Sequence, residues 1–136
     1  MKPERRVFCT RGGLALVADT FGDPDARPVL LAHGGGQTRH AWGGAAAALA
    51  RRGWHAIALD LRGHGESAWS PNGEYEFDVF AADLADVAAQ LAQTPALVGA
   101  SLGGIAGLIA RGESVNDVFS TVVLVDAGLE KNLRRG

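Results

Sequence analysis

Ser101 lies between two glycines, Gly99 and Gly103, with a short apolar run before this segment and an Ala-, Gly- and Ile-rich run after it. A strand that turns sharply into a helix at a serine raises the hydroxyl above the sheet edge, and the glycines remove side chains that would collide there. A hydroxyl held in this way can attack an acyl carbon. The spacing therefore predicts a nucleophile at Ser101; the alternative is a packing turn in which the serine is incidental.

A run of three glycines, Gly34 to Gly36, directly follows His33 at the end of another apolar segment. Attack on an acyl group places negative charge on its oxygen, which needs two fixed hydrogen-bond donors. The N–H of Leu102 can be one donor, because this residue begins the helix after the serine. We expect the N–H of Gly35 to be the other, since only glycine would let the backbone come so close. His33 and Gly34 would then support an oxyanion loop; a flexible turn is the alternative.

A third polar segment, from Asp60 to Ser67, follows a further apolar run and contains charged residues, a histidine and glycines. Asp60 and Arg62 could form an ion pair that braces this segment. We therefore expect it to support the loops around the serine rather than to react with a substrate.

The apolar pattern predicts which elements position these segments. Residues 6–9 and 14–20 flank a Gly-Gly pair and predict an antiparallel hairpin. Continuous apolar runs predict buried strands at residues 28–33, 55–60 and 96–100, and a fourth strand is predicted at residues 121–125. Helices are predicted between them at residues 42–52, 77–91 and 102–111, and in the second of these Asp83 marks the polar face. The alternation predicts one α/β domain over residues 1–136, with a mostly parallel sheet in three α/β/α layers.

Composition and charge narrow the range of partners. Thirteen basic and fifteen acidic residues leave a net charge of −2, which gives no electrostatic reason to expect nucleic acid or an anionic membrane. No apolar run approaches the roughly 20 residues that span a bilayer, and the N-terminus does not resemble a signal peptide. Cys9 is the single cysteine, which fits a reducing cytoplasm, and we expect it to be a buried, unreactive strand residue. No motif calls for a cofactor or a metal ion, so we expect neither.

The order of the three motifs resembles that of the α/β-hydrolase superfamily: the His33-Gly34 loop, then Asp60 to Ser67, then the turn at Ser101. The chain looks most like the bacterial esterase, haloperoxidase-like and epoxide-hydrolase-like branch, and Val122 to Asp126 resembles the next strand of that fold. The resemblance implies hydrolysis of a small ester or related acyl compound. Epoxide hydrolases and dehalogenases of the family use an aspartate as nucleophile, so the serine here favours acyl chemistry.

The family order places an acid and then a histidine after the nucleophile. All the histidines of this sequence precede Ser101, namely His33, His40, His55 and His64. His40 or His64 could approach the serine as a substitute base, and Asp126, after the last predicted strand, could be the acid. Loss of the triad histidine costs on the order of a millionfold in kcat in a serine protease. We therefore expect the N-terminal portion of a hydrolase, without the C-terminal strands and lid, that is weakly active or inactive by itself.

The last predicted strand suggests a second class of function. Residues 122–125 would form an exposed apolar edge unless another segment covers them. The chain could then be a non-catalytic fragment or interaction module that self-associates through this strand.

Overall fold

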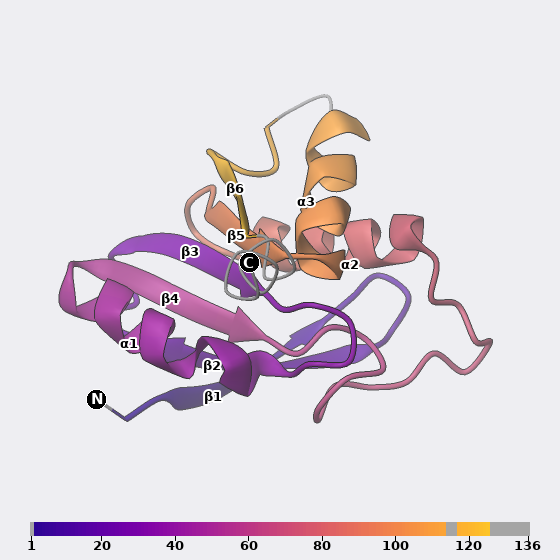
Figure 1. Cartoon of the computed structure of the whole chain (residues 1–136), viewed down its shortest axis with the longest axis horizontal. Helices are drawn as coiled ribbons and strands as arrows, with labels where there is room; N and C mark the ends of the chain where they lie inside the picture. Colours follow the sequence, from indigo (N-terminus) through magenta and orange to yellow (C-terminus); the bar gives the residue numbers. More distant parts are fainter. Residues whose placement is uncertain (1, 114–116, 126–136) are drawn as a thin grey trace, which may run out of the picture.

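The computed structural model describes residues 2–113 and 117–125 (Figure 1). Three consecutive strands come first, and helices and strands then alternate; each element predicted from the sequence is present within two residues of its expected bounds. In order they are β1 (Glu4–Cys9), β2 (Ala15–Phe21), β3 (Arg27–Ala32), the short 3-10 helix η1 (Arg39–Trp42), α1 (Gly43–Arg51), β4 (Trp54–Leu59), α2 (Phe77–Ala89), β5 (Ala96–Ala100), α3 (Leu102–Glu113) and β6 (Val122–Val125).

The strands form one mixed sheet in the order β1-β2-β4-β3-β5-β6. β1 and β2 make the antiparallel hairpin, β2 also pairs antiparallel with β4, and the remaining pairs are parallel. The last residue of β3, Ala32, is level with Leu59 of β4 and with Gly99 of β5. Because three neighbouring parallel strands end at the same height, the segments that follow them leave the sheet side by side.

Helices cover both faces of the sheet, which confirms the predicted three-layer α/β fold (Figure 1). On one face α1 packs through Ala46 against Phe21, Val29 and Leu31. On the other face α2 and α3 pack over a larger core. No helix in the described ranges is long and apolar enough to cross a membrane.

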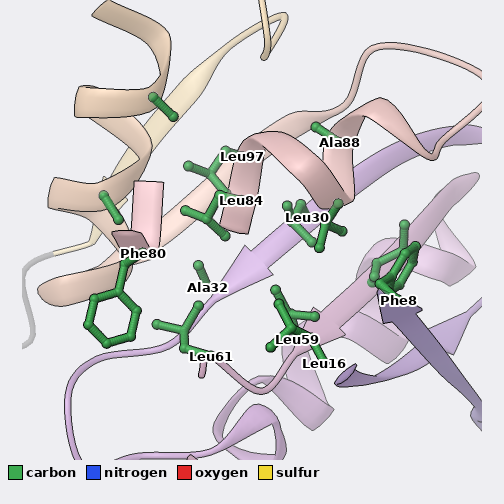
Figure 2. Close-up of a cluster of buried hydrophobic side chains, with 14 of the residues drawn as sticks. Phe8, Leu16, Leu30, Ala32, Leu59, Leu61, Phe80, Leu84, Ala88 and Leu97 are labelled. Atoms are coloured by element: carbon green, nitrogen blue, oxygen red, sulfur yellow. The ribbon is translucent and has the colours of Figure 1, made fainter. Parts of the chain in front are cut away.

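Figure 2 shows the larger core, in which alternate strand residues meet the inner faces of α2 and α3. Leu30 and Ala32 of β3 and Leu59 of β4 face Phe80 and Leu84 of α2, and all five are buried. A leucine or phenylalanine that is fully removed from water contributes about 1.5–3 kcal/mol. Since Ala32 and Leu59 end their strands, this core holds in place the points from which the loops of the candidate site begin.

Two expectations about single residues are wrong. Cys9 ends β1 as expected, but it is exposed because its side chain lies on the face opposite to that of the buried Phe8. Asp83 of α2 is buried rather than directed to solvent, because the side chain of Arg62 reaches it from the loop after β4.

The opposite edge strand, β6, is as exposed as the sequence predicts. Val123, Leu124 and Val125 are 46%, 55% and 38% exposed. In the described part of the chain, no element covers this strand on its outer side.

Candidate active site

Ser101 is the single residue between β5 and α3, and it is exposed. Its φ is +50°, and no other non-glycine residue in the described ranges has a positive φ. This left-handed conformation costs an L-amino acid roughly 1–2 kcal/mol. Backbone strain of this kind gathers at functional sites, where the surrounding structure maintains it. The N–H of Ile105 donates to the Ser101 carbonyl at 3.0 Å, so the first turn of α3 holds the serine.

The glycines on either side of Ser101 let the strand, the helix and β3 approach closely. A Cβ on Gly103 would collide with the backbone carbonyl of Ala32, and a Cβ on Gly99 would lie 2.5 Å from the backbone nitrogen of Gly104. In both cases the added Cβ would meet backbone atoms, which cannot move aside as a flexible side chain can. These contacts explain why glycine stands at both positions.

The loop from Gly34 to Gly36 lies over the Ser101 turn. A Cβ on Gly34 would be 3.5 Å from the Cβ of Ser101, and a Cβ on Gly35 would be 4.0 Å from Cδ2 of Leu102. A side chain at Gly35 would therefore meet no described protein atom closer than this. Gly36 is the residue that requires glycine, since its φ is +78°.

Most N–H groups of this loop already have partners. Gly34 donates to Oε1 of Gln37 at 3.0 Å, and Gly36 donates to Nε2 of His64 at 3.1 Å. The N–H of Gln37 donates to the carbonyl of Gly34 at 3.1 Å. The N–H of Gly35 has no partner among residues 2–113 and 117–125, so it is free to bind a ligand.

A second free donor lies at the start of α3. The N–H of Gly103 donates to the carbonyl of His33 at 3.2 Å, whereas the N–H of Leu102 has no partner in the described ranges. Helix N-termini favour negative charge because their first N–H groups lack intrahelical acceptors. Leu102 and Gly35 thus present two unused donors beside Ser101, which is the number that a developing oxyanion needs.

His33 is fully buried and connects two loops of the site. Its Nε2 accepts a hydrogen bond from the N–H of Leu61 at 3.0 Å, and its Nδ1 lies 2.7 Å from the carbonyl oxygen of Gly34. Because Nε2 accepts, Nδ1 must carry the proton and donate it to Gly34. Burial lowers the pKa of His33, which keeps the ring in the neutral form that this arrangement requires.

Arg39 is a residue of the site that sequence reasoning missed. Its side chain is 5% exposed and contacts three carboxylates: Asp60 at 2.5 Å, Glu66 at 2.6 Å and Asp19 at 3.1 Å. Burial alone would lower the pKa of Arg39, but these three partners raise it, so the guanidinium stays charged. The available signal was an arginine seven residues after the end of β3, a strand that ends level with β4, which the acidic segment follows.

The predicted ion pair between Asp60 and Arg62 is wrong. Arg62 makes two hydrogen bonds to Asp83 of α2, at 2.6 and 2.7 Å. Asp60 accepts the backbone N–H groups of Arg39 and Glu66 at 2.6 and 3.0 Å, in addition to the Arg39 side chain. Burial alone would raise the pKa of Asp60, but these donors hold it below its ordinary range. The segment braces the loops as expected, through partners other than those predicted.

Neither of the two candidate substitute bases forms a hydrogen bond with Ser101 in the described structure. His64 uses both ring nitrogens, one to accept the N–H of Gly36 and the other, at 2.9 Å, to donate to the carbonyl of Arg62. His40 has a side chain that is 68% exposed, and its nearest charged partner is a carboxylate 3.9 Å away.

The remaining candidates lie elsewhere. His55 is the second residue of β4 and so lies at the opposite end of the strands from Ser101. Asp126, the expected acid, lies outside the described residues. Within the ranges that the structure describes, no group of three or more His, Cys, Asp or Glu side chains could hold a metal ion.

Comparison with known proteins places this site in context. The model of a family described as alpha/beta hydrolase fold matches residues 27–135. An esterase of Mycobacterium tuberculosis is 39% identical over 99 residues, which cover 72% of this chain and 32% of the esterase. A non-heme chloroperoxidase of Kitasatospora aureofaciens is 38% identical over 106 residues, which cover 77% of this chain and 37% of that protein. The chain therefore spans about a third of the length of these two relatives.

The solved structures give the same fold. An epoxide hydrolase from Vigna radiata superposes with a TM-score of 0.82, at 23% identity, over 90% of this chain and 39% of the hydrolase. At that identity the likeness concerns the fold alone.

Proposed function

The chain belongs to the α/β-hydrolase fold family, and on that premise we propose that it carries the nucleophile and the oxyanion hole of a serine hydrolase for small carboxylic esters or related acyl compounds. The observation that carries the proposal is the left-handed φ of Ser101, at an exposed turn between β5 and α3. The cost of that conformation is reasonable where it serves to present the hydroxyl. The esterase among the relatives supports the acyl substrate class.

The proposed reaction begins with attack of the Ser101 hydroxyl oxygen on the acyl carbon while a base takes the hydroxyl proton. The carbonyl oxygen becomes an oxyanion, which the N–H groups of Gly35 and Leu102 stabilise. Collapse of this intermediate expels the alcohol, which takes up a proton, and leaves an acyl ester on Ser101. A water molecule then hydrolyses the ester and restores the hydroxyl.

The base is the incomplete part of this scheme. The four histidines of the sequence all precede Ser101, and the structure assigns none of them a hydrogen bond to it. We therefore expect the 136 residues alone to react slowly, and an added small base to raise the rate at a serine that is otherwise correctly presented.

Labelling with a fluorophosphonate tests the proposal without a natural substrate. The serine oxygen displaces fluoride from phosphorus, and imidazole added to the buffer takes the serine proton. We expect slow labelling that imidazole accelerates, with a single adduct at Ser101 located by peptide mass spectrometry. Ser101→Ala should abolish the adduct, whereas Ser120→Ala, which removes another exposed serine, should not. Absence of an adduct in imidazole, or adducts spread over several serines, would refute the nucleophile assignment.

An exposed apolar surface supports a second candidate function, self-association through β6. Leu124 and Val123 of this strand are about half exposed, and so are Ile105 and Leu108 of α3. A Cβ on Gly104 would lie 3.0 Å from Leu124, so the strand and the helix form one continuous surface. A second copy could pair with the edge of β6, which pairs with no strand beyond β5 in the described ranges, and cover these side chains. Sedimentation velocity would detect a dimer that Leu124→Lys weakens; a monomer at all concentrations would exclude this function.

The single cysteine is the basis for proposing a reducing compartment, the cytoplasm, as the location of the protein.

A further inference from the structure

Two histidines join the candidate oxyanion loop to the loop after β4, and each accepts a hydrogen bond from the backbone of the other loop. Nε2 of His33 accepts the N–H of Leu61 at 3.0 Å, and Nε2 of His64 accepts the N–H of Gly36 at 3.1 Å. The two rings are neighbours, with 4.9 Å between their centroids. The arrangement is reciprocal, so neither loop can move far without breaking a hydrogen bond to the other.

His33 determines the orientation of one peptide plane beside Gly35. The carbonyl of Gly34 and the N–H of Gly35 belong to the same peptide unit, which is planar and trans. That carbonyl accepts hydrogen bonds from Nδ1 of His33 at 2.7 Å and from the N–H of Gln37 at 3.1 Å. The two groups of a trans peptide point in opposite directions, so these bonds turn the N–H of Gly35, an exposed residue, away from His33.

His64 holds the next peptide plane, which joins Gly35 to Gly36. Its Nε2 accepts the Gly36 N–H, so its Nδ1 carries the proton and donates to the carbonyl of Arg62 at 2.9 Å. The side chain of Arg62 is in turn fixed by two hydrogen bonds to Asp83. A continuous set of contacts therefore runs from the buried face of α2 to the glycine loop.

We propose that His64 is a positioning residue for the oxyanion donor at Gly35, holding the peptide plane on one side of that donor while His33 holds the other. The inference rests on the proposed function of Gly35, but the hydrogen bond at Gly36 can be tested without any reaction. A run of three glycines has more backbone freedom than any other three-residue sequence. An oxyanion donor is effective only when it is fixed before the charge develops. The restraint must therefore come from residues outside the run, and His64 supplies it at Gly36.

The first test is spectroscopic and uses the 136-residue chain itself. Long-range nitrogen–proton correlation on labelled protein at pH 7.5 should show the His64 proton on Nδ1. Exchange of the Gly36 amide should be about five- to tenfold faster in His64→Ala, because one hydrogen bond is lost. His64→Gln retains an acceptor at similar reach and should restore most of the protection. A proton on Nε2, or Gly36 exchange that is unchanged in His64→Ala, overturns the proposal.

The second test measures the consequence for the reaction. Imidazole-assisted labelling of Ser101 by the fluorophosphonate should be slower in His64→Ala by about ten- to a hundredfold, since small misplacement of a reacting group has effects of this size. His64→Gln should recover most of the rate. The matched control is His40→Ala, which removes an exposed histidine with no hydrogen bond to the glycine loop and should label like the unsubstituted chain.

The two tests separate the positioning role from the proposed function. Suppose that His64→Ala is labelled as fast as the unsubstituted chain while its Gly36 amide exchanges faster. The positioning role is then overturned, and the assignment of Ser101 as nucleophile is unaffected. If the unsubstituted chain is not labelled either, the proposed function fails. The tautomer of His64 and the exchange rate of the Gly36 amide then still decide whether His64 holds the glycine loop. Should circular dichroism show that His64→Ala is unfolded, the tautomer of His64 in the unsubstituted chain decides the question: a proton on Nδ1 supports the proposal, and a proton on Nε2 overturns it.

Discussion

The guanidinium of Arg39 and the carboxylate of Asp60 form a buried ion pair, with Nη1 of Arg39 2.5 Å from Oδ2 of Asp60. The backbone N–H of the same arginine donates to the other carboxylate oxygen at 2.6 Å. The first residue of η1 thus contacts both oxygens of a residue that follows β4. This pair ties the segment after β3 to the segment after β4.

Arg39→Ala should destabilise the chain by about 3–5 kcal/mol, because it leaves the Asp60 carboxylate buried without its main partner. Arg39→Lys keeps a charge but loses the fork of donors that reaches Asp19 and Glu66, so we expect a smaller loss. Urea unfolding followed by circular dichroism gives both values. Arg52→Ala removes an exposed arginine and serves as the control, with a change within about 0.5 kcal/mol. Equal effects at the two arginines would contradict the assignment.

Stability should fall in mild acid because His33 is buried as a neutral ring. Burial lowers its pKa, so the unfolded chain binds a proton at a higher pH than the folded chain does. The contribution of neutral His33 to the stability of the folded chain is therefore complete above the ordinary histidine pKa of about 6.5. It is lost as the pH falls below that value. His55 acts in the same direction, because burial and the nearby Arg6 lower its pKa.

The urea concentration at the midpoint of unfolding, measured from pH 8 to pH 5, tests this dependence. It should decline toward pH 5, and His33→Gln should flatten the decline, since glutamine does not titrate. A midpoint that rises toward pH 5 would show that the folded state gains protons instead.

The positive φ of Ser101 gives a stability prediction that is independent of catalysis. Glycine adopts the left-handed conformation without a steric penalty, whereas alanine has the same steric penalty as serine. Ser101→Gly should therefore be about 1 kcal/mol more stable to urea than Ser101→Ala, although both lack the nucleophile. If the two variants unfold at the same midpoint, the turn is not strained in solution and the main support for the nucleophile assignment is lost.

Local sequence patterns predicted the strands, the helices and the glycine-flanked serine, because these features depend on residues close together in the chain. The run from Ala96 to Ala100 is apolar at every position since it is a central parallel strand, and Ser101 with Gly103 marks its turn into α3. Such patterns report which residues avoid water and where the backbone needs glycine. They are sufficient to place Ser101 at the sheet edge.

The partners of the charged residues could not be predicted in this way. Arg62 was expected to pair with Asp60, two residues away, yet it reaches Asp83, which is 21 residues away in α2. Arg39 was not recognised at all, because its partners come from β2 and from the loop after β4. Pairings of this kind depend on strand order, and nothing in the spacing of the charged residues encodes that order.

Two glycines of the same helix, Gly103 and Gly112, should respond in opposite ways to alanine. A Cβ on Gly103 would meet the backbone carbonyl of Ala32, so α3 would have to move away from β3, at a cost of about 2–3 kcal/mol. A Cβ on Gly112 would meet nothing within 4 Å, and alanine stabilises a helical position relative to glycine by about 0.5–1 kcal/mol. Urea unfolding of Gly103→Ala and Gly112→Ala measures both changes. Fluorophosphonate labelling of Ser101 should fall in the first variant and stay unchanged in the second, because only the first shifts the start of α3, where the Leu102 donor lies. Tolerance of alanine at Gly103 would mean that β3 and α3 are not in contact in solution.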